Sequence, residues 1–132
     1  MWHLWRRLWQ RKPLTLGARG EAAAARYLKR KGYQIVARSD SGKFGELDIV
    51  AVDKRTVVFV EVKTRRSAHK GHPVEAVDRA KRRKITWLAA AYLKRHRLSE
   101  CRSRFDIVAI TWPDDVKRPT IEHYPNAFDA ED

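Results

Sequence analysis

Two neighbouring stretches decide the fold: GELDIV at residues 45–50 and VVFVEVK at residues 57–63. β-branched and aromatic residues fill the second stretch, which is typical of a β-strand. Because both of its faces are apolar at the start, we expect it to be a central strand of a sheet. A two-residue connection joins the strands that we predict over 44–53 and 56–64, and it indicates a tight hairpin.

Charged side chains interrupt this apolar hairpin near its open end. Side chains alternate across a strand, so Glu61 and Lys63 point the same way. The two-residue turn sets the register, which predicts that Asp48 lies directly opposite Glu61 and Glu46 opposite Lys63. Directly opposed side chains have Cβ atoms roughly 4.5–5.5 Å apart. Two carboxylates that close repel each other, and burial strengthens the repulsion, so stability alone does not favour this pair.

A divalent cation between Asp48 and Glu61 would remove the repulsion. Mg²⁺ is commonly held by one or two carboxylates together with waters and phosphate oxygens. Lys63 beside such an ion could stabilise developing charge or activate a water molecule. The alternative is a strand that ends in solvent, where Glu61 and Lys63 form a surface ion pair.

A third carboxylate belongs to the helix that we predict over 16–31, where an alanine-rich run gives high helix propensity. Glu21 lies three, four and seven residues before Ala24, Ala25 and Leu28, so it heads the apolar stripe of this helix. Two interpretations stand equally at this point. Glu21 could reach the same ion as the hairpin carboxylates, or it could be a favourable charge near the helix N-terminus.

The rest of the chain completes one domain. The order α-β-β-β-α-β-β predicts an α/β fold with a mixed central sheet of about five strands flanked by helices. We expect a basic, tryptophan-rich extension at 1–12, a single domain at 13–128 and an acidic tail at 129–132. The remaining predicted elements are a strand at 33–38, a turn-rich loop at 39–43, a helix from Pro73 to about Arg97, and strands at 104–111 and 117–124.

The net charge of +13 over 132 residues, with a pI of about 10.4, indicates a polyanionic partner. Nucleic acid is the first candidate and an anionic membrane surface the second. The single cysteine excludes an internal disulfide, no Cys/His spacing resembles a zinc site, and the composition suits the cytoplasm. No apolar run approaches the roughly 18 residues of a membrane-spanning helix.

The second helix carries an unexpected cation. Lys81 falls four residues from both Val77 and Ile85, which puts it on the inward face. It could contact a phosphate near the metal, or its stem could lie along the helix edge with the charge in water. The histidines His69, His72 and His123 lack ligand spacing, and we expect them in a mobile loop or at the surface. The cations predicted to bind nucleic acid are Lys81, Arg65, Arg66, Lys70, Arg82, Arg83 and Lys84.

Together these residues resemble the PD-(D/E)XK pattern of restriction-endonuclease-like proteins, with Glu21 in a helix, Asp48 in GELD, and Glu61-Val62-Lys63 in the next strand. The closer similarity is to the YraN family, small bacterial proteins that look like Holliday junction resolvases. It runs from about residue 17 to residue 128. Its other motifs are Arg19-Gly20-Glu21, Gly45-Glu46-Leu47-Asp48, Phe59 to Arg65, Lys81, Arg104-Phe105-Asp106 and Asn126-Ala127-Phe128.

The resemblance implies a restriction-endonuclease-like fold and a metal-dependent phosphodiesterase site. Asp48, Glu61 and Glu21 would be ligands of Mg²⁺ or Mn²⁺, and Lys63 would position or activate the attacking water. DNA, including branched DNA, would be the substrate, and symmetric cutting would suggest a homodimer. One alternative is a nucleic-acid-binding protein of the same fold with little or no catalytic activity. Another, resting on residues 1–12 alone, is a basic membrane-surface protein.

Overall fold

The computed structural model describes residues 14–69 and 71–132. The tryptophan-rich extension predicted at 1–12 and the cation Lys70 lie outside the described residues. The elements follow the predicted order α-β-β-β-α-β-β. They are α2 (Leu16–Arg30), β1 (Gln34–Gly42), β2 (Gly45–Asp53), β3 (Thr56–Arg65), α3 (Arg79–Arg95), β4 (Arg102–Thr111) and β5 (Thr120–Phe128).

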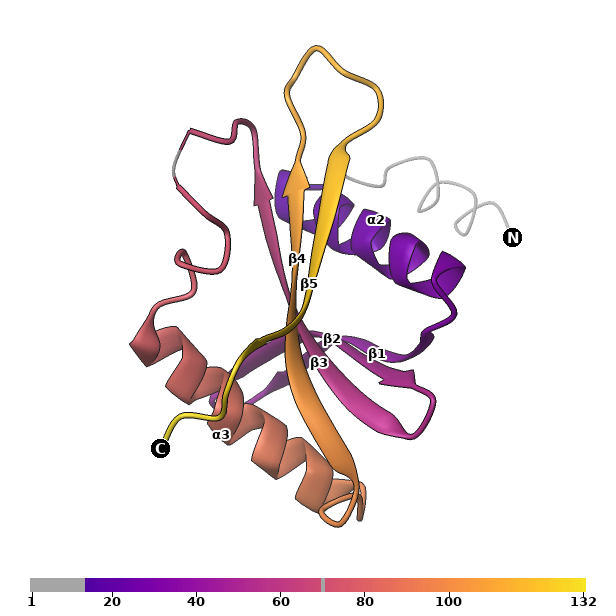
Figure 1. Cartoon of the computed structure of the whole chain (residues 1–132), viewed down its shortest axis with the longest axis vertical. Helices are drawn as coiled ribbons and strands as arrows, with labels where there is room; N and C mark the ends of the chain where they lie inside the picture. Colours follow the sequence, from indigo (N-terminus) through magenta and orange to yellow (C-terminus); the bar gives the residue numbers. More distant parts are fainter. Residues whose placement is uncertain (1–13, 70) are drawn as a thin grey trace, which may run out of the picture.

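The five strands form one mixed sheet in the order β1-β2-β3-β4-β5. Neighbouring strands are antiparallel except β3 and β4, which run parallel. The crossover between those two contains α3, and the two helices cover opposite faces of the sheet (Figure 1). The predicted α/β class, the element order and the central position of β3 are therefore confirmed, and β5 lies at the sheet edge. Neither described helix is long and apolar enough to cross a membrane.

Each face of the sheet has its own hydrophobic core. On the α2 side, Leu28 packs with Ile49 and Ala51, while on the α3 side Phe59 packs with residues of α3. Strict alternation along β2 predicts that Leu47 shares the face of Ile49 and Ala51. That prediction is wrong, because Leu47 belongs to the α3-side core. The alternation of β2 therefore breaks between Leu47 and Ile49, at Asp48.

The second helix begins later than the sequence pattern predicts. Residues 73–76 form turns, and Asp78 is the N-cap of α3, its carboxylate accepting the Lys81 N–H at 2.8 Å. An aspartate at this position satisfies an otherwise unpaired helix donor. The Arg82 side chain stabilises the preceding turns, since it donates to the carbonyls of Val74 and Val77.

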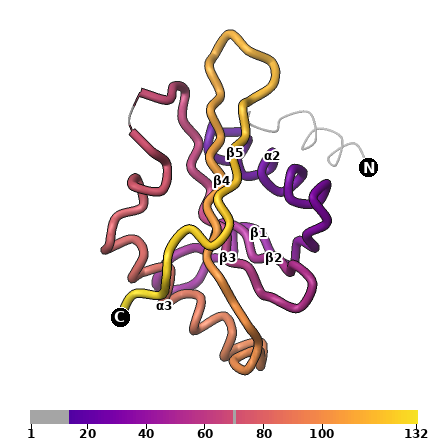
Figure 2. Tube along the Cα trace, in the orientation of Figure 1, coloured from indigo at the N-terminus to yellow at the C-terminus, as the bar shows by residue number. Residues whose placement is uncertain are grey.

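The two strands at the sheet edges are also displaced from their predicted bounds. β1 includes residues 39–42, which the sequence pattern assigns to a loop, because it continues pairing with β2 as far as the turn before Gly45. β5 reaches Phe128, because a bulge in the β4–β5 ladder lets Phe128 pair with Phe105. The chain end then passes beside α3, where the Glu131 N–H donates to Thr86 (Figure 2).

Candidate metal and nucleic-acid site

The second strand separates from the third at the residue that the sequence singles out. The predicted hairpin register is confirmed from Asp53–Thr56 to Ile49–Val60, where the ladder ends. Asp48 and Glu61 would be the next pair; the ladder does not include them, but their carboxyl groups interact as expected. Instead, the Asp48 carboxylate accepts the Val62 N–H at 2.9 Å. The side chain replaces a ladder hydrogen bond at the point where the strands part.

The predicted pairing of Glu46 with Lys63 fails for the same reason. Beyond the end of the β2–β3 ladder, Glu46 pairs only with Ser41 of β1, whose hydroxyl donates to its carboxylate at 3.0 Å. The Glu46 carboxylate lies beside that of Glu21 on α2, in the same cavity that Lys63 of β3 lines. Separation of the strands opens space beside β3 for side chains from three elements.

Three carboxylates gather in that space. Oxygens of Glu21, Glu46 and Asp48 all lie within 4.8 Å of one another. They line a cavity of about 490 Å³, which Lys63 also lines, and we call it the acidic cavity. The sequence pattern placed Glu46 and Asp48 on one face of their strand but did not mark Glu46 as a ligand. Glu46 is thus the functional candidate that sequence reasoning missed.

Close packing of α2 on β3 sets the position of Glu21. A β-carbon at Gly20 would overlap the Thr64 side chain, so only glycine permits this approach. The next residue, Glu21, then reaches across the cavity mouth, where it accepts the Ser39 hydroxyl at 2.6 Å. Thr15 caps the helix by accepting the Ala18 N–H, and both residues line the cavity. The positive end of the α2 dipole therefore faces the carboxylates.

Glu61 approaches Asp48 from the other side of the sheet. Its side chain is 8% exposed, and its Oε1 lies 3.6 Å from Nζ of Lys81 on α3. The alternative of a surface ion pair between Glu61 and Lys63 is therefore wrong. Lys81 faces the sheet as predicted, but its ammonium contacts a carboxylate. Glu61 is not one of the three clustered carboxylates, but it interacts with Asp48 and Lys63, which both line the acidic cavity.

Burial makes these carboxyl groups resist ionisation. Burial, followed by the charge of Asp48, raises the pKa of Glu61 to about 7. Burial likewise raises the pKa of Asp48, although the Val62 N–H and Lys81 oppose the change. The pKa of Glu21 is raised by burial too, partly offset by the Ser39 hydroxyl. A bound cation would favour the charged forms and reverse these shifts.

The donor set fits a hard divalent cation. Mg²⁺ takes oxygen ligands at about 2.1 Å in octahedral geometry, which places adjacent oxygens about 3 Å apart and opposite ones about 4.2 Å apart. The separations in the acidic cavity, at most 4.8 Å, approach that range. Small side-chain rotations of Glu21, Glu46 and Asp48 would bring one oxygen from each to a common ion.

The predicted nucleic-acid-binding cations have different surroundings. Arg66 pairs with Asp114, and Arg65 donates to the carbonyl of Gly71 at 2.9 Å. Arg82 is engaged within the fold, as described above. Arg83 and Lys84 are exposed on α3, and neither has an ion pair with a described carboxylate. Both are free to meet a phosphate, as is Lys94 near the C-terminus of α3.

A second charged cluster, at the other end of α2, is structural. Asp106 is fully buried and accepts hydrogen bonds from Arg104, His123 and the Asn126 N–H. Burial alone would raise the pKa of Asp106, but these three donors together hold it below its ordinary value. The expectation that His123 lies at the surface is wrong, because its side chain is 1% exposed and binds Asp106.

Fold and cavity together define a class: a small α/β protein whose mixed sheet opens beside a cluster of carboxylates, with cations on the flanking helix. The sequence profile described as "Uncharacterised protein family UPF0102" matches residues 20–110 of the chain. The protein belongs to this family. The matched span includes all the carboxylates of the site and both Lys63 and Lys81.

Individual relatives agree with the profile. The chain is 50% identical to the UPF0102 protein of Rhodopirellula baltica over 118 residues, covering 87% of this chain and 71% of that protein. It is 47% identical to the UPF0102 protein of Syntrophotalea carbinolica over 118 residues, covering 89% and 94% of the two chains. These names give a family and no activity. The resemblance to the YraN family and to PD-(D/E)XK nucleases therefore stays a prediction.

Proposed function

We propose that this protein is a metal-dependent endonuclease that hydrolyses phosphodiester bonds in DNA, including branched DNA. The carboxyl pair of Asp48 and Glu61 beside the acidic cavity is the observation that carries the proposal. Two partly desolvated carboxyls with raised pKa values destabilise a metal-free fold, and such groups concentrate at functional sites. A divalent cation accounts for their presence.

Each residue of the site then has a role. Asp48 is central, because it interacts with Glu61 on one side and with Glu21 and Glu46 on the other. These four would hold Mg²⁺ or Mn²⁺, which when bound supplies Lewis-acid activation of the phosphate and a lowered pKa of bound water. Lys63, which lines the same cavity, would orient the attacking water or stabilise the charge of the transition state.

DNA is the expected substrate on electrostatic grounds. A net charge of +13 attracts a polyanion at long range. The exposed Arg83 and Lys84 follow Lys81 within one helical turn, so phosphates bound there would lie near Glu61. The acidic cavity itself repels phosphate until a cation neutralises it, which makes productive binding depend on the metal.

The test is cleavage of supercoiled, linear and four-way-junction DNA with Mg²⁺, Mn²⁺ or EDTA. We expect cutting with either metal and none with EDTA. Asp48→Asn, purified in parallel, controls for contaminating nuclease and should leave the DNA intact. Wild-type protein that cuts no substrate with either metal would overturn the proposed activity.

A nucleic-acid-binding protein without catalysis is the second candidate, and one contact favours it. Lys81 partners Glu61 at 3.6 Å, so a lysine already neutralises one of the carboxylates that a metal would need. This candidate predicts DNA binding of equal strength with Mg²⁺ and with EDTA, and no cutting. The endonuclease predicts tighter binding with a divalent cation.

A further inference from the structure

Two large aromatic side chains are exposed side by side where the β1–β2 hairpin meets α3. Phe44, between β1 and β2, is 59% exposed, and Trp87 of α3 is 53% exposed. Their ring centroids are 5.0 Å apart with the planes at 87°, an edge-to-face contact. We call this pair the aromatic platform. Water contact over so much aromatic surface is unfavourable, so the pair is a candidate for ligand contact.

The backbone brings the two rings together. Gly45 has a φ of +147°, and a β-carbon there would lie 2.8 Å from Cε of Lys84 and 3.2 Å from Leu88. Glycine thus lets the tip of the β1–β2 hairpin rest directly on α3. The same hairpin carries Glu46 two residues after Phe44. The platform and the acidic cavity are therefore held on one structural unit.

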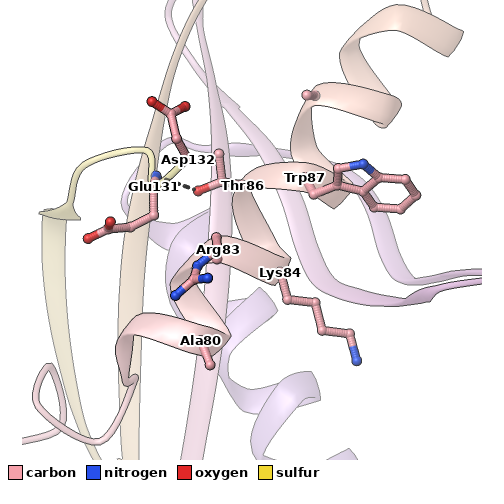
Figure 3. A pocket seen from close by; sticks show the side chains of 8 residues that line it. Ala80, Arg83, Lys84, Thr86, Trp87, Glu131 and Asp132 are labelled. Carbon is pink, nitrogen blue, oxygen red and sulfur yellow. Dashed lines mark hydrogen bonds between the residues drawn. The ribbon is translucent and has the colours of Figure 1, made fainter.

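Trp87 also borders a groove along the outer side of α3. The groove has a volume of about 550 Å³ and is lined by Ala80, Arg83, Lys84 and Ala90 as well as Trp87 (Figure 3). Glu131 and Asp132 line it near Thr86, where Arg79 pairs with the Glu131 carboxylate at 3.4 Å. The groove has an apolar floor, a cationic side near Trp87 and an acidic side at the chain end.

The charges around the platform favour an anionic ligand. Nζ of Lys43 lies 5.6 Å from the centre of the Phe44 ring. Lys43, like Arg83 and Lys84, has no ion pair with a described carboxylate. Arg95 is paired with Asp40, which also lines the hollow between the hairpin and α3. Cations of this kind around exposed aromatic rings are the combination that binds single-stranded nucleic acid, by stacking of bases and contact with phosphates.

We propose that the aromatic platform stacks an unpaired base, while Lys43, Arg83 and Lys84 hold the phosphates on either side of it. This inference rests on the proposed function and narrows its substrate to DNA with a single-stranded segment next to the cleaved bond. Lys84 is three residues from Lys81, which contacts Glu61. A strand that follows this side of α3 would run from the platform toward the carboxylates.

The test is binding in EDTA, which separates the platform from catalysis. The probes are a single-stranded oligonucleotide containing 2-aminopurine, whose fluorescence falls on stacking, and a fully paired duplex of the same sequence. Phe44→Ala and Trp87→Ala should each weaken single-strand binding about fivefold or more and reduce the quenching. Both should leave duplex binding within about twofold. Trp87→Phe keeps a stacking surface and should retain most of the affinity.

A second comparison distinguishes stacking from charge. Lys84→Glu should weaken single-strand and duplex binding alike, because phosphate contacts are common to both. Both aromatic side chains are exposed, so thermal melts of the alanine variants should match wild type. For each variant we compare its affinity for the single strand with its affinity for the duplex. A loss of folded protein lowers both affinities equally and so leaves their ratio unchanged.

The outcomes separate this inference from the proposed function. Alanine variants that bind and quench the single strand like wild type would overturn the platform, even if the protein cuts DNA. The platform would also be overturned if the alanine substitutions altered only self-association or binding to another protein and left single-strand binding unchanged. A platform that behaves as expected in a protein that never cuts DNA would support the inference and contradict the nuclease. Wild type that binds neither probe in EDTA would overturn the platform, whereas the nuclease is tested separately by cleavage with Mg²⁺ or Mn²⁺.

Discussion

Nζ of Lys81 lies 3.6 Å from Oε1 of Glu61, which joins α3 to the central strand at the point where β2 leaves β3. The pair is unequal, since the lysine side chain is 40% exposed and the glutamate side chain 8%. The contact lowers the cost of a buried carboxylate but does not abolish it, because burial and Asp48 still raise the pKa of Glu61.

The first prediction concerns pH and stability without metal. The pKa of Glu61 is about 7 in the folded protein and near 4.5 in an unfolded chain. Between those values the folded state binds more protons, so the free energy of unfolding should fall as pH rises from about 4.5 to 7. Glu61→Gln removes this titration. Urea unfolding in EDTA should therefore show a smaller fall in the free energy of unfolding between pH 5 and pH 7.5 for the variant than for wild type. An identical fall in both proteins would refute the raised pKa of Glu61.

The second prediction separates charge from hydrogen bonding at Asp48. Asp48→Asn keeps an oxygen for the Val62 N–H and removes a charge beside Glu61. It should stabilise the metal-free protein or leave it unchanged. Asp48→Ala leaves that N–H without its acceptor and should lower the free energy of unfolding by about 1–3 kcal/mol. Thermal and urea melts in EDTA decide, and a clear loss of stability in the asparagine variant would contradict the repulsion.

The third prediction treats Asp106 as the structural carboxylate. Asp106→Asn leaves Arg104 without its buried anionic partner and should cost about 3–5 kcal/mol of stability. Asp114→Asn, whose partner Arg66 is exposed, is the matched control and should change little.

The same carboxylate predicts a response to acid. The pKa of Asp106 is lower in the folded protein than its ordinary 3.8. Its stabilising contribution is therefore complete above about pH 4 and lost as pH falls through the folded-state pKa. The asparagine variant should lack this acid-dependent component in urea melts. If wild type and the asparagine variant lost equal stability below pH 4, Asp106 would not be the source of the acid-dependent component.

The fourth prediction concerns the basic side of α3. Changing Arg83 and Lys84 together to Glu should weaken binding to all DNA sequences alike and flatten the salt dependence. Each phosphate that the protein no longer neutralises changes the slope of log affinity against log salt by about 0.9. The control is the same double change to Glu at Lys54 and Arg55, in the turn between β2 and β3, which alters the net charge by the same amount. Equal effects of the two double variants would mean that net charge alone governs binding.

Local pattern was enough to predict much of the sheet. The β-branched run around Phe59 and the two-residue turn indicated the hairpin and the central strand, because both signals act over a few residues. The register was also right as far as Ile49–Val60. Beyond it, packing on α2 and α3 overrides alternation, so the turn of Leu47 onto the α3 side was not predictable from β2 alone.

The candidate site was predicted in part, because some of its residues are marked by local sequence pattern and others are placed by contacts between distant elements. Asp48 stood out because the hairpin register sets it opposite Glu61, which follows an apolar run, and Glu21 because it heads an apolar stripe. Glu46 was assigned a lysine partner by a register that ends before reaching it. His123 was placed at the surface because its partner, Asp106, lies on another strand and no local spacing connects them.

The fifth prediction is the catalytic one. Glu61→Gln and Lys63→Ala should each reduce Mg²⁺-dependent cleavage about 10²–10³-fold, the usual loss for one such electrostatic group. DNA binding should survive in both. The causes differ, because Gln weakens the hold on the metal whereas Ala removes a charge that acts on water or the transition state. Excess Mn²⁺ should therefore partly restore the Gln variant and leave the Ala variant inactive.

The most direct test of the central claim is the rate at which purified wild-type protein cuts junction and supercoiled DNA with Mg²⁺, measured beside Glu61→Gln, Lys63→Ala and Asp48→Asn. The account predicts cutting by wild type, cutting abolished by EDTA, and a large loss in all three variants with DNA binding retained. Wild type that cuts nothing with Mg²⁺ or Mn²⁺, or variants that cut as fast as wild type, would contradict it.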